Sequence, residues 1–213
     1  MLAIIDYSMG NLHSVNKALQ HVSDEKVIIT SDSDEILNAD RIVFPGQGAA
    51  RDCMSELHKR ELVDVVKEVS TTKPFLGVCM GMQVLMEHSV EGGGIDCIGL
   101  YKGTVQHFTD HIGATDEAGN RLKIPQMGWN QINHTSNHPL WAKIKNDARF
   151  YFVHSYFVEP TDKSIITGET DFGITYPSAI AKDNVFAIQS HPEKSADDGL
   201  QLLKNFTQWD GQS

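Results

Sequence analysis

The chain has 213 residues, 40% hydrophobic and 22% charged, so one globular domain spanning 1–213 is expected. The 28 acidic and 18 basic residues give a formal net charge of −10, which argues against a nucleic-acid binder because phosphate contacts need clustered Lys and Arg. No apolar run approaches the roughly 20 residues of a membrane span, and three cysteines without a CxxC spacing favour neither disulfides nor zinc. We expect a reduced, cytoplasmic protein without nucleic acid, membrane, metal or cofactor.

The first half of the chain alternates short apolar runs with helical patterns. Residues 2–6 predict a buried strand, not a signal peptide, because no basic region or small-residue cleavage site accompanies them. Residues 11–22 predict a helix, since Leu12, Val15 and Leu19 share one face. Strands that alternate with helices predict a mainly parallel sheet. The other predicted elements here are strands at 26–30, 41–44 and 74–78, helices at 54–69 and 81–88, and a helix that starts at 32–35 with Ser31 or Ser33 as its cap.

The second half is mostly strand-like between residues 99 and 176. Residues 199–209 predict a closing helix, because Leu202, Phe206 and Trp209 share one face. The fold class predicted for the whole chain is therefore α/β, with an open, mainly parallel sheet, flanking helices and an antiparallel extension. The further expectations are strands at 150–153, 164–167 and 185–189, a flexible triglycine loop at 91–95, and a hairpin tip or surface loop at 110–122.

The strongest chemical signal is Gly77-Val78-Cys79-Met80-Gly81, where a predicted buried strand runs into a cysteine and a helix follows. This order is typical of a nucleophile elbow with Cys in place of Ser. The glycines permit close chain approach in a strained turn, and the helix N-terminus favours a thiolate. The Met80 N–H can point at a developing oxyanion. From this segment alone, a buried packing cysteine is an equal alternative.

A second motif, His191-Pro192-Glu193, directly follows the predicted strand 185–189. A thiol nucleophile needs a base, and that base needs an acceptor to orient it. His191 could take the Cys79 proton and Glu193 could fix the imidazole tautomer, because parallel strands bring both motifs to one sheet edge. His191 and Glu193 alone would indicate a solvated loop, but with Cys79 they indicate a catalytic triad.

A third motif, Pro45-Gly46-Gln47-Gly48, follows the predicted strand 41–44. Two glycines at a strand end let a backbone amide approach a ligand closely, so Gly46, Gln47 and Gly48 could complete an oxyanion hole with Met80. A tight turn or a phosphate loop is the alternative. Neither GxGxxG nor GxxxxGK is present, which disfavours a nucleotide cradle.

Together these motifs resemble the class I glutamine amidotransferases, and the resemblance covers essentially the whole chain. That family has a flavodoxin-like fold and carries a G-x-C-x-G-x-Q elbow, a distant H-P-E and a glycine-rich oxyanion loop. Gln47 departs from the family, which usually carries a small apolar residue there. The matching residues are Gly77, Cys79, Gly81 and Gln83, then His191, Pro192 and Glu193, then Pro45, Gly46 and Gly48.

Segments 6–12, 125–130, 151–156 and 191–195 resemble the subset of this family that serves histidine biosynthesis. The resemblance implies a heterodimer in which ammonia from glutamine crosses to a (β/α)₈-barrel cyclase subunit. It also implies that Gln83 and the backbone at Ser155 and Tyr156 hold glutamine. Without it, Trp129 and Tyr151 would be interpreted as core. The residues implied at or near the partner interface are Asn11, Gln126, Trp129, Tyr151 and Lys194.

The implied activity is hydrolysis of glutamine to glutamate and ammonia, with Cys79 as nucleophile, His191 as base and Glu193 as its orienting carboxylate. Three alternatives stay open. The chain could be another Cys-His-Glu hydrolase such as a γ-glutamyl peptidase, or a binding module with an inactive site. It could also be a glutaminase that feeds a different synthase, for surface sugars, pyridoxal phosphate or anthranilate.

Overall fold

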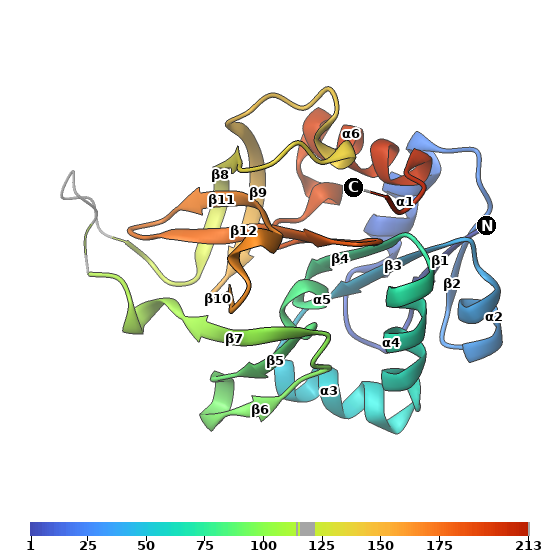
Figure 1. The fold of residues 1–213 in the computed structure, drawn as a ribbon, viewed down its shortest axis with the longest axis horizontal. Helices are drawn as coiled ribbons and strands as arrows, with labels where there is room; N and C mark the ends of the chain where they lie inside the picture. The colour runs from blue at the N-terminus through green and yellow to red at the C-terminus, as the bar shows by residue number, and fades with distance from the viewer. Residues whose placement is uncertain (114, 116–121, 213) are drawn as a thin grey trace.

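The computed structural model describes residues 1–113, 115 and 122–212 (Figure 1). Within these residues a nine-stranded sheet runs through the middle of the molecule, and a four-stranded sheet lies beside it. In spatial order the large sheet contains β2 (Val27–Thr30), β1 (Leu2–Ile5), β3 (Arg41–Gly46), β4 (Phe75–Cys79), β13 (Val185–Ile188), β12 (Thr175–Lys182), β11 (Ile166–Asp171), β8 (Gln126–His134) and β9 (Ala148–His154). The smaller sheet contains β10 (Tyr156–Pro160), β7 (Tyr101–His107), β5 (Met86–Ser89) and β6 (Ile95–Asp96).

The large sheet changes character along its width, as the sequence predicts. From β2 to β13 neighbouring strands are parallel, and from β13 to β9 they are antiparallel. Cys79 ends β4 and His191 follows β13, two adjacent parallel strands paired as Ile188 with Val78. The two predicted catalytic motifs therefore leave the sheet at the same edge.

Helices cover both faces of the parallel half (Figure 1). Ala3 and Ile5 of β1 pack in one apolar cluster with α2, α3 and α4, whereas Leu2 and Ile4 face the cluster that holds α1 and α6. Every residue of β1 is buried because side chains alternate between two covered faces. The helices are α1 (Leu12–Val22), α2 (Ser33–Asn38), α3 (Ala50–Lys59), α4 (Leu62–Thr72), α5 (Met80–Gln83) and α6 (Ala196–Gln208).

The single helix predicted at 54–69 is wrong, because the chain forms α3 and α4 with a break between them. Glu61 adopts a left-handed backbone, with φ 57° and ψ 30°, and the Arg60 N–H donates to the Glu56 carbonyl oxygen. The break turns the chain so that Leu57 and Leu62 are both fully buried. No Gly or Pro marks it, so the continuing apolar spacing conceals it.

The helix predicted at 81–88 is also wrong. It ends at Gln83, and Met86–Ser89 forms β5, which pairs with β6 and β7. The small sheet thus outweighs local helix propensity. Two other boundaries differ: Asp32 rather than a serine caps α2, with its Oδ1 3.0 Å from the Glu35 nitrogen, and β11 starts at Ile166 after a 3₁₀ turn.

The other predicted strands, α1 and the closing helix are confirmed with small shifts in their bounds. The closing helix α6 begins at Ala196 and buries Leu202 and Phe206 fully. The triglycine segment carries a 3₁₀ turn at Glu91–Gly93. Within the predicted loop 110–122, residues 114 and 116–121 lie outside the described part of the chain. Across the described residues, no helix has the length and apolar character needed to cross a membrane.

Candidate active site

Cys79 occupies a strained turn between β4 and α5, with φ 56° and ψ −110°. Both flanking glycines are required by close chain approach. A Cβ on Gly77 would lie 2.9 Å from the Gly81 carbonyl oxygen, and a Cβ on Gly81 would overlap the Phe44 carbonyl oxygen. The strand–turn–helix geometry is therefore present, but α5 has only four residues. Its positive end contributes the free N–H groups of one turn and little additional dipole.

His191 is a buried histidine that is oriented by a buried carboxylate. Its Nδ1 lies 2.8 Å from Glu193 Oε1, and the two side chains are 9% and 2% exposed. With Glu193 accepting from Nδ1–H, Nε2 is left for Cys79. Burial alone would lower the pKa of His191, but hydrogen bonds to Cys79 and Glu193 and their negative charge raise it to about 10. The site therefore favours an imidazolium beside the sulfur.

Strand β9 fixes the main chain of His191. The His191 N–H donates to the Tyr151 carbonyl oxygen at 2.9 Å. Ser195 Oγ donates to the His191 carbonyl oxygen at 2.6 Å and accepts from the Tyr151 N–H at 2.9 Å. Since both backbone groups of His191 are engaged, the imidazole is positioned by a rigid frame.

The glycine loop after β3 lies directly beside the nucleophile, because Gly46 pairs with Cys79 in the sheet. A Cβ on Gly46 would collide with the Tyr7 hydroxyl and lie 2.9 Å from the Met80 Cβ, so no larger residue fits. Gly48 has φ 92°, and Gln47 and Gly48 are exposed. The Gln47 carbonyl oxygen accepts from the Cys53 thiol at 3.6 Å.

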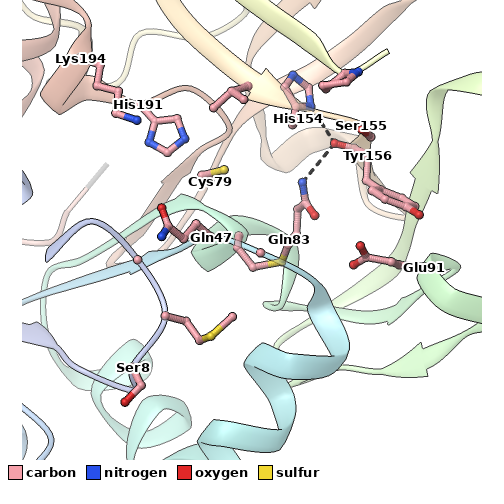
Figure 2. A pocket seen from close by; sticks show the side chains of 16 residues that line it. Ser8, Gln47, Cys79, Gln83, Glu91, His154, Ser155, Tyr156, His191 and Lys194 are labelled. Carbon is pink, nitrogen blue, oxygen red and sulfur yellow. Dashed lines mark hydrogen bonds between the residues drawn. The ribbon is translucent and has the colours of Figure 1, made fainter.

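These elements surround one cavity of about 630 Å³ (Figure 2). Cys79 and His191 both line it, and Gln83 points toward the backbone of Ser155 and Tyr156. Gln83 Nε2 donates to the Tyr156 carbonyl oxygen at 3.1 Å. Glu193 lies behind His191. The lining residues are Ser8, Met9, Gly10, Gln47, Gly48, Cys79, Met80, Gln83, Glu91, Pro125, Val153, His154, Ser155, Tyr156, His191 and Lys194.

The cavity contains a residue that sequence reasoning missed. Glu91 is the one carboxylate among its described lining residues, and its Oε2 accepts from the Ala50 N–H at 2.6 Å, at the start of α3. Arg51 Nη2 donates to the Gly94 carbonyl oxygen at 3.2 Å, which holds the same loop against α3. No local motif identifies Glu91, because only the tertiary contact carries the triglycine segment to the cavity.

The predicted interface residues fall into different environments. Trp129 is 44% exposed and faces Tyr151 across the β8–β9 pair, with ring centroids 6.2 Å apart. Lys194 Nζ lies 6.0 Å from the Tyr151 ring centroid. Asn11 is exposed and caps α1 through the Ser14 N–H.

Gln126 differs from the other predicted interface residues, because it is only 4% exposed. Its Oε1 lies 2.8 Å from the Tyr176 hydroxyl, so its side chain faces inward. The neighbouring Met127, which sequence reasoning did not single out, is 66% exposed. With Trp129 it forms an apolar face on β8, which we call the β8 face.

Comparison with known proteins agrees with this geometry. A family model described as glutamine amidotransferase class-I matches residues 3–209. A crystal structure of a glutamine amidotransferase superposes with a TM-score of 0.71 at 12% identity, covering 96% of this chain and 98% of that one. The PurLQS structure from Thermotoga maritima superposes with a TM-score of 0.70 at 15% identity, covering 97% of each chain. The chain is therefore a member of the class-I glutamine amidotransferase family of enzymes.

Relatives with similar sequences show to which part of the class-I family the chain belongs. The imidazole glycerol phosphate synthase subunit HisH of Hydrogenovibrio crunogenus is 53% identical over 100% of this chain and 98% of its own. The HisH subunit of Pseudomonas putida is 51% identical over 99% of this chain and 98% of its own. Within its class, the chain thus belongs to the HisH family.

Proposed function

We propose that this chain is the glutaminase subunit of an imidazole glycerol phosphate synthase. It hydrolyses glutamine to glutamate and ammonia, and delivers the ammonia to a (β/α)₈-barrel cyclase subunit. The observation that carries the proposal is the meeting of Cys79, His191 and Glu193 at one sheet edge beside a cavity, in a chain about half identical to HisH subunits.

The chemistry begins when His191 takes the proton of the Cys79 thiol and the sulfur attacks the side-chain amide carbon of glutamine. The amide of Met80 and one from the Gly46–Gly48 loop stabilise the oxyanion of the tetrahedral intermediate. His191 gives its proton to the amide nitrogen as the carbon–nitrogen bond breaks, which releases ammonia and leaves a γ-glutamyl thioester. His191 then takes a proton from water, whose oxygen attacks the thioester, and glutamate leaves as the thiol is restored.

The charges around the cavity suit an amino acid. Glutamine carries one ammonium and one carboxylate at its α-carbon. Glu91 and Lys194 supply opposite charges on the cavity wall, and the backbone at Ser155 and Tyr156 supplies polar groups. We assign Glu91 to the ammonium, since the other acid of the site, Glu193, is occupied by His191.

The β8 face supports the partner assignment. Met127 and Trp129 are the large apolar side chains that stand exposed in the described part of the chain. Exposed aromatic and methionine side chains on one face are typical of protein interfaces. A partner over this face and over Lys194 would cover the cavity mouth, so ammonia could pass without escaping to water. The surface role of Asn11, Tyr151 and Lys194 belongs to the same proposal.

Two broader assignments complete the proposal. Residues 1–213 form one amidotransferase domain, in line with the family match over 3–209. The protein works in the cytoplasm, where thiols stay reduced, and its Cys53, Cys79 and Cys97 are free.

The test is glutamate production from glutamine by the wild-type chain and by Cys79→Ser, each with the cyclase subunit. The variant should lose glutaminase activity and still bind the partner, because Cys79 is only 6% exposed and the substitution changes one buried atom. Cys97→Ser serves as the control, since Cys97 lies outside the cavity and should retain activity. Glutamate formation by Cys79→Ser at the wild-type rate would refute the nucleophile assignment.

A further inference from the structure

A buried glutamine that does not line the cavity contacts the nucleophile. Gln189 follows β13 and is fully buried, two residues before His191. Its Nε2 lies 3.6 Å from the Cys79 sulfur, within the range of a hydrogen bond to sulfur. Its backbone N–H donates to the Ser178 carbonyl oxygen at 2.8 Å, which ties it to β12.

The direction of this amide is fixed by a chain of hydrogen bonds. The Tyr156 carbonyl oxygen can only accept, and Gln83 Nε2 donates to it (Figure 2). The same Nε2 donates to Gln189 Oε1 at 2.9 Å. Since that end of Gln189 must be the oxygen, the other end, which faces Cys79, must be the NH₂ donor.

The last acceptor in this series of hydrogen bonds, the Tyr156 carbonyl oxygen, is itself held in place. The Tyr156 carbonyl oxygen also accepts from His154 Nδ1 at 2.7 Å, so two side chains fix the peptide that orients Gln83. Gln83 is 2% exposed and Gln189 is fully buried, so water does not compete for these bonds. An amide held in this way cannot turn its oxygen toward the sulfur without leaving buried groups unpaired.

We propose that Gln189 is a further catalytic residue, which donates a hydrogen bond to the Cys79 sulfur and so favours the thiolate that attacks glutamine. The inference rests on the proposed glutaminase function. A donor stabilises a charged sulfur more than a neutral thiol, because hydrogen bonds to ionised groups are about twice as strong. Gln189 therefore complements His191, which supplies the positive charge beside the same atom.

The experiment measures the rate at which iodoacetamide alkylates Cys79, resolved by peptide mass spectrometry, as a function of pH. The variants are Gln189→Leu, which removes the whole amide, and Gln189→Glu, which keeps an acceptor for Gln83 and replaces the donor. Ser190→Ala is the matched control, because Ser190 is a buried neighbour whose hydroxyl has no hydrogen-bond partner among the described residues.

We expect Gln189→Leu to move the pH of half-maximal alkylation upward by about one unit, which is the effect of losing one hydrogen bond to a charged group. Gln189→Glu should move it further in the same direction, because its carboxylate repels the thiolate. In the glutaminase assay with the cyclase, kcat of Gln189→Glu should fall about tenfold or more while KM for glutamine stays near wild type. Ser190→Ala should follow the wild-type curve.

A Gln189→Glu profile that overlays the wild-type profile, in protein with an unchanged circular dichroism spectrum, would overturn the inference. The inference would also be overturned if folded Gln189→Leu moved the pH of half-maximal alkylation no more than Ser190→Ala does. Alkylation requires no glutamine and no partner. A failure of the proposed glutaminase function would therefore appear in the activity assay alone, and would leave the alkylation result to decide the role of Gln189.

Discussion

The two halves of the large sheet are built under different constraints. In the parallel half, the nucleophile turn is set by backbone contact, since Gly46, Gly77 and Gly81 each sit where a Cβ would meet neighbouring atoms. In the antiparallel half, β8 presents Met127 and Trp129 to solvent, 66% and 44% exposed, and the Tyr151 ring packs edge-on against Trp129. The catalytic geometry is thus enforced from inside the molecule, while the β8 face is the surface that we propose a partner covers.

The catalytic site and β8 are linked through His154, which ends β9, by a set of contacts that we call the seam. His154 Nδ1 donates to the Tyr156 carbonyl oxygen, the same acceptor that orients Gln83. On its other side, His154 Nε2 lies 3.2 Å from the Tyr176 hydroxyl, which contacts Gln126 at the start of β8. A continuous set of buried polar contacts therefore joins the two regions. Each prediction below separates one region from the other.

The largest effect is a loss of kcat, expected when the carboxylate that pairs with His191 is neutralised. In Glu193→Gln, the His191 imidazolium loses its carboxylate partner, so kcat should fall by about 10³-fold, or about 4 kcal/mol. Partner binding should be unchanged, because Glu193 is buried behind His191. Steady-state glutamate formation measures kcat, and titration calorimetry measures partner binding. Glu159→Gln, an exposed change on β10, is the matched control; equal losses in both variants would contradict the assignment.

The next effect tests the backbone constraint directly. Gly81→Ala places a Cβ on the Phe44 carbonyl oxygen and should lower the free energy of unfolding by at least about 3 kcal/mol, since β3, which carries Phe44, cannot move without losing its pairing with β4. Urea denaturation gives the value. Gly113→Ala is the control, because among the described residues its Cβ would meet only the Thr115 carbonyl oxygen, at 3.7 Å. Similar midpoints for both variants would show that the elbow is not sterically fixed.

Lowering the pH should reduce the free energy of unfolding through His154. Burial lowers the pKa of His154 to about 4, so its unfolded form, at about 6.5, binds a proton first as the pH falls. The stability associated with neutral His154 is complete above pH 6.5 and is lost between pH 6.5 and about 4, by about 3 kcal/mol. His154→Asn keeps a donor for the Tyr156 carbonyl and removes this titration. Burial also lowers the pKa of His138, to about 4, and that of His134, so both add to the slope in the wild type and in the variant.

Urea denaturation at a series of pH values measures the dependence at the seam. The wild-type free energy of unfolding should fall more steeply between pH 6.5 and 4 than that of His154→Asn. Parallel curves for the two proteins would mean that His154 does not remain neutral in the folded state.

The smallest effect is expected at the β8 face. Trp129→Ala should weaken the complex with the cyclase subunit by about 2 kcal/mol, as truncated interface aromatics often do. It should change the free energy of unfolding by less than about 0.5 kcal/mol, because Trp129 is 44% exposed. Lys59→Ala, an exposed change on α3, serves as the control. A large loss of stability with unchanged binding would make Trp129 a structural residue.

The same contrast explains what the sequence could predict. The strands of the parallel half, α1 and α6 follow from apolar periodicity, and the positions of Cys79 and His191 follow from strand ends in a parallel sheet. The break at Glu61 and the early end of α5 could not be predicted, because tertiary packing and pairing with β7 override local pattern. Glu91 and Gln189 were missed because only the folded chain brings them to the cavity and the sulfur.

We propose that a catalytic centre held in place by internal packing works in a complex formed through the β8 face. The most direct test of this proposal is glutamate production from glutamine by the purified chain, alone and with the cyclase subunit and its ribonucleotide ligand. We predict that the complex produces glutamate much faster than the isolated chain. At limiting cyclase, Trp129→Ala should weaken this stimulation, and saturating cyclase should restore it. A rate of glutamate formation that the cyclase subunit does not change would contradict the proposed partner, although Cys79 could still be the nucleophile.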